Sequence, residues 1–162
     1  VKKINIWGRD PKKAEKVKAD HSYLDVNIES DIEKLVTESS LIVTTTSSKD
    51  PLIQSEWVKP GTHITAVGSD TPEKCELDPN LLSRADLLVA DSLEQNLIRG
   101  EIHQAAKQSL IDSENVVELG EVFSGIKKGR VNQDSITIAD LTGVAVQDLV
   151  IAQAVFKAAK EA

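Results

Sequence analysis

Short apolar runs alternate with longer mixed segments along the whole chain. The short runs predict strands over 4–7, 23–26, 41–46, 62–67, 87–90 and 135–138. The runs 41–46 and 62–67 are rich in β-branched residues, which favour strands. The run 41–46 is apolar or β-branched at every position. This composition predicts a parallel strand that is buried on both faces.

The segments between these runs carry apolar residues at helical spacing or are rich in Lys, Ala and Glu, which favours helices. They predict helices over 12–19, 32–39, 80–84, 93–98, 101–108, 118–123 and 143–160. Asp10 is the expected N-cap of the first helix, with Pro11 in its first turn, and Ser30 or Asp31 caps the second. This alternation predicts an α/β fold with a parallel sheet, helices on both faces and ligands at the carboxyl ends of the strands.

Composition and charge exclude several classes of protein. The length of 162 residues suits one domain, and 40% hydrophobic residues are enough for a core. A net charge of −7 argues against a binder of duplex nucleic acid. No apolar run approaches the roughly 20 residues that cross a bilayer, and the single cysteine, Cys75, cannot form an internal disulfide. We therefore expect a cytoplasmic protein without nucleic-acid or membrane partners.

The strongest candidate chemistry follows the strand 62–67. Gly68 has no Cβ and would let the backbone approach a flat ring, Asp70 comes next but one, and Lys74 lies four residues further on. A carboxylate beside a partly apolar ring tends to have a raised pKa, and it could act as a general acid or base toward an amine or imine. Spacing alone favours the plainer alternative, in which Gly68 bends a turn and Asp70 caps it.

Two other strand ends carry candidate cofactor contacts. Arg9 could accept the 2′-phosphate of NADP, or it could be a solvated surface residue, and Asp10 could reach the ribose hydroxyls, so the choice between NAD and NADP stays open. The segment 44–48 is Thr-Thr-Thr-Ser-Ser and could bind a pyrophosphate or ribose, although a simple Ser/Thr turn fits it equally well. The three histidines lie far apart, so no metal site is expected, and Cys75 is expected to be an ordinary half-buried residue.

The glycine-rich turn of a dinucleotide fold, G-x-G-x-x-G, does not occur in the sequence. Either the chain is not a dinucleotide domain, or the strand and loop that carry the motif precede Val1.

Six stretches are specific when taken together, in their order and spacing. They are I-W-G-R-D-P-K-K-A (6–14), L-I-V-T-T-T-S-S-K-D-P-L-I (41–53), W-V-K-P-G-T-H-I-T-A-V-G-S-D-T-P-E-K-C-E-L-D (57–78), R-G-E-I (99–102), E-L-G-E-V-F-S-G-I-K-K-G-R (118–130) and I-T-I-A-D-L-T-G-V-A-V-Q-D (136–148). With them the chain resembles the ornithine cyclodeaminase/mu-crystallin family over nearly its whole length.

The resemblance implies a Rossmann-type, doubly wound and mostly parallel sheet that binds NAD or NADP and here lacks its first strand and glycine-rich loop. Residues 1–144 would form this partial domain. Residues 145–162 would form a helix that packs on an N-terminal substrate-binding domain, through which the family forms homodimers. The open sheet edges would invite pairing with another chain.

The resemblance also implies roles for individual residues. Asp70 would be the catalytic acid/base, or would hold an iminium cation electrostatically. The implied cofactor contacts are Arg9, Asp10, Thr46, Val67, Gly68, Ser69, Lys74, Leu141, Thr142 and Gly143. Leu141 replaces the serine of cyclodeaminases, which weakens the case for ornithine, and the W-G-R stretch resembles members that use a phosphorylated cofactor. The stretches around Asp70 and Leu141 look closest to the imine-reductase and ectoine-utilisation branch.

Two functions from different classes follow. The first is an NAD(P)-dependent imine or amino-acid oxidoreductase, or a cyclodeaminase, acting on a small amino or imino acid. This chain alone is expected to be inactive and to bind dinucleotide weakly or not at all. The second is a non-catalytic protein that binds a nucleotide or small ligand, as mu-crystallin suggests. Asp70 and Lys74 favour the enzyme, because a binder has less need of such a pair.

Overall fold

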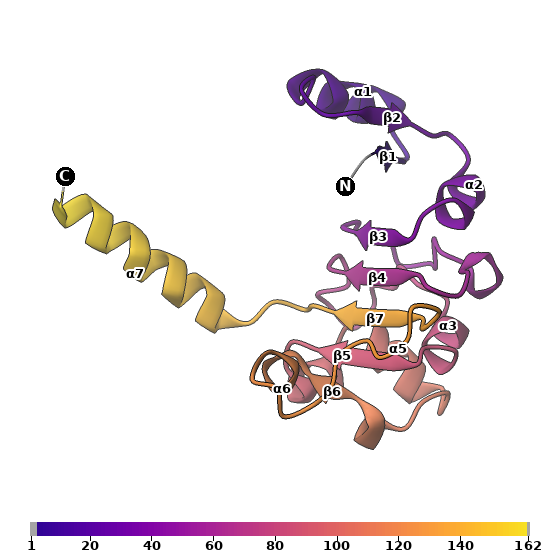
Figure 1. The fold of residues 1–162 in the computed structure, drawn as a ribbon, viewed down its shortest axis with the longest axis vertical. Coiled ribbons are helices and arrows are strands. Elements are labelled where there is room, and N and C mark those ends of the chain that lie inside the picture. The colour runs from indigo at the N-terminus through magenta and orange to yellow at the C-terminus, as the bar shows by residue number, and fades with distance from the viewer. Residues whose placement is uncertain (1–2, 162) are drawn as a thin grey trace.

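The computed structural model describes residues 3–161, which form two parallel β-sheets (Figure 1). The smaller sheet pairs β1 (Ile4–Ile6) with β2 (Val26–Ile28). The larger sheet has five strands in the order β3 (Leu41–Thr44), β4 (His63–Ala66), β7 (Thr137–Asp140), β5 (Leu87–Ala90) and β6 (Val117–Glu118). Every neighbouring pair is parallel, which confirms the predicted α/β class.

The helices lie close to their predicted positions. They are α1 (Pro11–Asp20), α2 (Ile32–Thr37), α3 (Pro79–Ser83), α4 (Leu93–Asn96), α5 (Glu101–Lys107), α6 (Leu119–Phe123) and α7 (Ala145–Glu161). Asp10 caps α1 by accepting the Lys12 amide at 3.0 Å. Of the two candidates for the second cap, Asp31 takes the role and accepts two amides of α2. No helix among residues 3–161 has the length and apolar character that a membrane span needs.

Two strands are displaced from their predicted positions. The strand expected over 23–26 begins only at Val26, because Tyr23 and Leu24 lie exposed beside a turn. The strand expected over 135–138 runs from Thr137 to Asp140. The strand β6 has only two residues, too few to be recognised as an apolar run, so the sequence pattern does not predict it.

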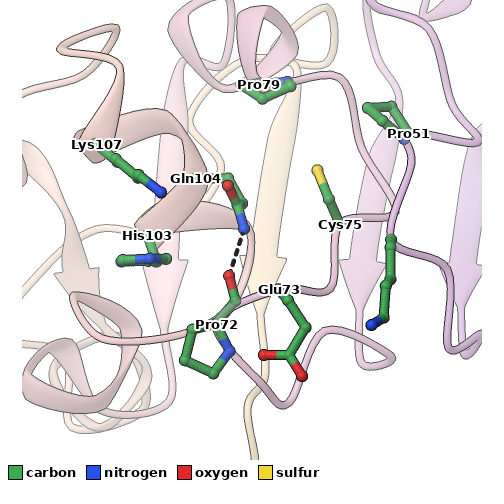
Figure 2. Close-up of a pocket in the computed structure, with 9 residues that line it drawn as sticks. Pro51, Pro72, Glu73, Cys75, Pro79, His103, Gln104 and Lys107 are labelled. Carbon is green, nitrogen blue, oxygen red and sulfur yellow. Dashed lines mark hydrogen bonds between the residues drawn. The ribbon is translucent and has the colours of Figure 1, made fainter.

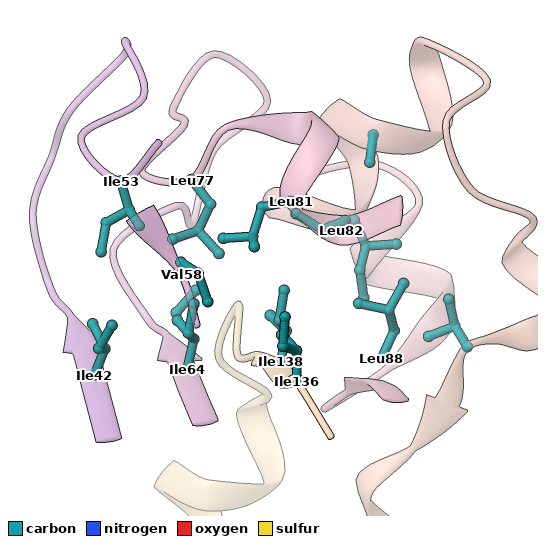
Figure 3. Close-up of a cluster of buried hydrophobic side chains, with 14 of the residues drawn as sticks. Ile42, Ile53, Val58, Ile64, Leu77, Leu81, Leu82, Leu88, Ile136 and Ile138 are labelled. Atoms are coloured by element: carbon teal, nitrogen blue, oxygen red, sulfur yellow. The ribbon is translucent and has the colours of Figure 1, made fainter. Parts of the chain in front are cut away.

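The hydrophobic core lies on one face of the five-stranded sheet (Figure 3). Ile42, Ile64 and Ile138 point into it from neighbouring strands, and Leu81 and Leu82 of α3 cover them, each 4% exposed or less. Fully burying an aliphatic side chain of this size contributes about 1.5–3 kcal/mol. This face therefore supplies most of the apolar stabilisation of the sheet.

The opposite face of β3 is open. Leu41 and Val43 are 52% and 58% exposed, so the prediction that 41–46 is buried on both faces is wrong. A parallel strand is buried on both sides only where helices cover both, and the described residues place none over these two side chains. A groove of about 790 Å³ lies beside this strand, between β3 and β1. The α7 helix buries none of its residues and projects away from the sheets (Figure 1).

Candidate functional site

The loop 68–77, which leaves the carboxyl end of β4, carries Asp70 and Lys74. The Lys74 ammonium donates to Asp70 Oδ1 at 2.5 Å, and the two side chains are 23% and 55% exposed. The hydrogen bond and the charge of Lys74 hold the pKa of Asp70 below its ordinary value. Among the described residues the Asp70 carboxylate faces solvent and a cation rather than an apolar ring, so its pKa is lowered instead of raised.

Gly68 lies just past the end of β4, close to the segment that follows β3. A Cβ at this position would stand 2.0 Å from the Thr46 carbonyl oxygen and 2.5 Å from the Glu76 carboxyl carbon. Only glycine fits so close an approach. The approach of the two strand ends thus explains this glycine without any flat ring beside it.

Two buried glutamates, which sequence reasoning did not single out, hold this junction. Glu76 accepts the Thr46 amide at 2.5 Å and the Gly68 amide at 2.9 Å. Glu101 accepts the Ser69 hydroxyl and the amides of Glu76, at 2.8 Å, and Leu77, at 3.1 Å. Glu76 and Glu101 lie within the stretches 57–78 and 99–102 that carry the family resemblance. Hydrophobic patterning assigns glutamate to the surface, so it does not indicate that these two side chains are buried.

Burial and hydrogen bonding act against each other on Glu101. Burial raises its pKa, because desolvation penalises the charged form, while the bonds from Ser69 and the two amides favour that form. Ser69 is only 2% exposed, and its side chain turns toward Glu101. Because this exposure is that of the whole residue, Ser69 offers almost no surface to a cofactor.

The loop after β7 lies beside the end of β4. Leu141 donates its amide to the Ala66 carbonyl at 2.8 Å. Asp91, at the end of β5, accepts the Thr142 hydroxyl at 3.2 Å and the Gly143 amide at 2.8 Å. Gly143 has a φ of 84°, a left-handed conformation that favours glycine. Three predicted site residues are thus brought to the edge that carries Asp70.

Arg9 and Asp10 lie on the other sheet, after β1. The Asp10 carboxylate caps α1, so the helix already uses this side chain. Trp7, which precedes them, lines the same groove as Thr46. Thr46 is the predicted site residue that lines this groove, which lies between β1 and β3, whereas Arg9, Asp10 and the residues of the loop 68–77 lie outside its lining.

A second, shallower depression of about 540 Å³ lies beside the loop 68–77 (Figure 2). Glu73, His103 and Lys107 line it, whereas Asp70 and Lys74 do not. Cys75 also lines it, but burial, and next the Glu101 charge, raise the pKa of this thiol to about 12. Cys75 is therefore no nucleophile near neutral pH. Residues 3–161 contain no group of three or more His, Cys, Asp or Glu side chains that could hold a metal ion.

The sequence profile of the ornithine cyclodeaminase/mu-crystallin family matches residues 1–162. The chain belongs to this family. It is 42% identical to the "Uncharacterized cyclodeaminase y4tK" of Sinorhizobium fredii, over 99% of this chain and 50% of the relative. The chain spans about half the length of the curated family members that it matches.

Two solved family structures share the fold of the chain. The iminosuccinate reductase of Paracoccus denitrificans, in complex with NAD+, is 38% identical with a TM-score of 0.90, over 99% of this chain and 49% of that one. An archaeal alanine dehydrogenase dimer with bound NAD is 35% identical with a TM-score of 0.93, over 99% and 50%. The sheets and the loop 68–77 thus lie within a fold whose solved family members bind a nicotinamide dinucleotide.

Proposed function

We propose that the complete protein is an NAD(P)-dependent enzyme that interconverts a small imino acid and the corresponding amino acid. The observation that carries the proposal is the Asp70–Lys74 pair, with 2.5 Å between Nζ and Oδ1, at the strand edge that also holds the 141–143 loop. Family membership and the two dinucleotide-bound neighbours support the cofactor class.

The strand edge fits a dinucleotide in several respects. The Thr44 hydroxyl is buried beside the groove and has no hydrogen-bond partner among the described residues. Val67, 41% exposed, offers an apolar surface at the end of β4, and a Cβ on Gly143 would meet no atom within 4 Å. Arg9 and Asp10 would hold the adenosine ribose side. The other residues that would contact the cofactor are Thr46, Val67, Gly68, Lys74, Leu141, Thr142 and Gly143, whereas Ser69 is buried and its hydroxyl donates to Glu101.

When bound, the nicotinamide would accept or supply the hydride. The task left to this chain is to stabilise the positive charge on the substrate nitrogen. Asp70 suits this task as a carboxylate, because Lys74 keeps its pKa low. Of the two roles considered, holding the iminium cation electrostatically is therefore favoured over donating a proton. The same carboxylate would serve a cyclodeaminase, in which the amine is first oxidised to the imine.

The domain organisation belongs to the same proposal. Residues 1–144 would form the cofactor-binding part, and residues 145–162 would pack on a further domain that mediates dimer formation. The apolar side chains along α7 support this, since they are between 56% and 63% exposed: Val146, Leu149, Val150, Ile151, Val155 and Phe156.

The experiment compares Asp70→Asn with the wild type in the complete protein. Turnover is measured with NADH and NADPH on Δ1-pyrroline-2-carboxylate and iminosuccinate, and with NAD+ on ornithine. Loss of the carboxylate should lower kcat/KM by about 10²- to 10⁴-fold, the range of a positioned catalytic group. Glu73→Gln is the matched control, because Glu73 lies exposed on the same loop and lines the other depression.

Two outcomes would contradict the proposal. Full activity of Asp70→Asn would exclude the assigned role of this carboxylate. Dinucleotide binding without turnover of any imino or amino acid would instead support a non-catalytic binding protein.

Arg9→Ala adds a test of cofactor choice, since it should raise KM for NADPH more than KM for NADH if Arg9 meets a 2′-phosphate.

A further inference from the structure

Two glutamates that are fully buried hold the loop 68–77 at both of its ends. Glu101, the first residue of α5, accepts the Ser69 hydroxyl at the start of the loop and the amides of Glu76 and Leu77 at its end. Glu76 accepts the amides of Gly68 and Thr46. Together the two carboxylates tie the loop that carries Asp70 to the ends of β3 and β4 and to α5.

The chemistry of these contacts requires carboxylates. Both oxygens of Glu76 accept an N–H, and both oxygens of Glu101 accept at least one donor. An amide side chain would turn its NH₂ group toward one of these donors, and two donors cannot bond to each other. Among the described residues no Lys or Arg bonds to either carboxylate, so uncharged donors alone offset their desolvation. Such an arrangement is stable only while all the donors stay in place.

Neither carboxylate reaches solvent or faces the groove, so neither can touch a substrate. The chain connection is nevertheless short, because Ser69 directly precedes Asp70 and the amide of Asp70 bonds back to the Gly68 carbonyl at 3.1 Å. A shift of Ser69 would therefore move Asp70. Displacements of about 1 Å can cost a hundredfold in rate when a catalytic group is misplaced.

We propose that Glu101 is a positioning residue of the reaction, which sets the place of Asp70 through the Ser69 hydroxyl and through the amides of Glu76 and Leu77. This inference rests on the proposed function, since it needs a reaction in which Asp70 takes part. It assigns to the R-G-E-I stretch a role at a distance from the substrate, and it accounts for a buried glutamate at the start of α5.

The test uses Ser69→Ala and Glu101→Gln in the complete protein. Ser69→Ala removes one donor and leaves the two backbone bonds of Glu101, so it keeps the experiment informative if Glu101→Gln does not fold. Loss of a hydrogen bond to a charged acceptor should raise the population of the opened loop by about ten- to a hundredfold. Ser69→Ala should therefore lower kcat about tenfold, while KM for the dinucleotide changes less than about twofold.

A second readout does not depend on turnover. Amide hydrogen exchange in the peptide 68–78, followed by mass spectrometry, should speed up about tenfold in Ser69→Ala and more in Glu101→Gln. The matched control is Asp86→Asn, which weakens a carboxylate bond to the Ile136 amide, 2.8 Å long, at the opposite ends of the strands. This control should leave exchange in 68–78 and kcat unchanged.

The outcomes separate the inference from the proposed function. Wild-type kcat and exchange in Ser69→Ala and Glu101→Gln, with Asp70→Asn inactive, would overturn the inference and leave the function standing. Equal loss in Asp86→Asn would also overturn it, because the effect would then be general destabilisation. If Asp70→Asn keeps full activity, the proposed function fails, and hydrogen exchange alone then decides whether Glu101 holds the loop.

Discussion

The five-stranded sheet and the peripheral elements differ sharply in how they are held. Ile64, Leu77 and Leu81 of the sheet region have no exposed surface, and the network of Glu76 and Glu101 ties the strand ends together. The small β1–β2 sheet with α1 buries only Ala14 and Val26, and α7 buries nothing. The five-stranded sheet is therefore a packed unit. The small sheet with α1, and the helix α7, keep much of their surface uncovered by the described residues.

This difference divides the candidate site. Asp70, Lys74 and the 141–143 loop lie on the packed sheet, where neighbouring bonds fix the backbone. Arg9 and Asp10 follow β1 of the less buried sheet. The residues proposed to act on the substrate would thus be held more rigidly than those proposed to bind the adenosine ribose. Cofactor binding would then depend on how the two sheets are held relative to each other.

The largest expected effect comes from making the same type of substitution, leucine to alanine, once in each of the two regions. Leu82→Ala removes a side chain that is 1% exposed and should lower the free energy of unfolding by about 3–5 kcal/mol, because it leaves a cavity in the core. Leu149→Ala on α7 should change it by less than about 0.5 kcal/mol. Urea unfolding of the 162-residue chain, followed by circular dichroism, measures both. Similar losses in the two variants would show that α7 is packed in solution.

A smaller effect is expected from a second matched pair, Gly68→Ala and Gly8→Ala. A Cβ on Gly68 would press against the Thr46 carbonyl, whereas a Cβ on Gly8 would meet nothing within 4 Å. Overpacking of this kind costs about 1–3 kcal/mol, while Gly8→Ala should stay within about 0.5 kcal/mol of the wild type. The same urea unfolding measures both variants. Tolerance of Gly68→Ala would mean that the ends of β3 and β4 approach less closely than the structure shows.

The fold was predictable wherever local sequence decides it. The apolar run at 87–90 coincides with β5, and the Asp10 cap with Pro11 marks the start of α1. Prediction failed where burial depends on distant segments. The composition of 41–46 is typical of a strand that is covered on both faces. Residues 3–161 leave Leu41 and Val43 exposed, because covering them would require a segment that is distant in the sequence.

The candidate site was predictable from residue types but not from their surroundings. Sequence spacing placed Asp70 and Lys74 on one loop, and the structure brings them into contact. The direction of the Asp70 pKa could not be predicted, because it depends on exposure and on where the Lys74 ammonium comes to lie. Glu76 and Glu101 were missed because a carboxylate held by backbone amides, a hydroxyl and a thiol has no sequence pattern.

The smallest expected effect concerns two ion pairs, one in each region. Lys34 lies 2.6 Å from Glu29, which follows β2, and Lys74 lies 2.5 Å from Asp70. In both pairs the hydrogen bond from the lysine lowers the pKa of the carboxylate. Lys34→Met and Lys74→Met should therefore raise the pKa of Glu29 and Asp70 toward 4.5 and 3.8, which carboxyl titration by NMR measures.

Each pair has one side chain that is more than half exposed, so neither pair should contribute much to stability. A carboxylate with a depressed pKa stabilises the fold above its unfolded pKa and loses this contribution as the pH falls through its folded pKa. The two variants should therefore differ slightly from the wild type at neutral pH and converge with it only once the pH has fallen through the folded pKa values, which lie below the ordinary values of Glu29 and Asp70. Activity separates the pairs, because only Lys74→Met alters the charge beside the proposed substrate cation. Equal loss of turnover in Lys34→Met would show that the peripheral sheet controls the reaction as strongly as the packed one.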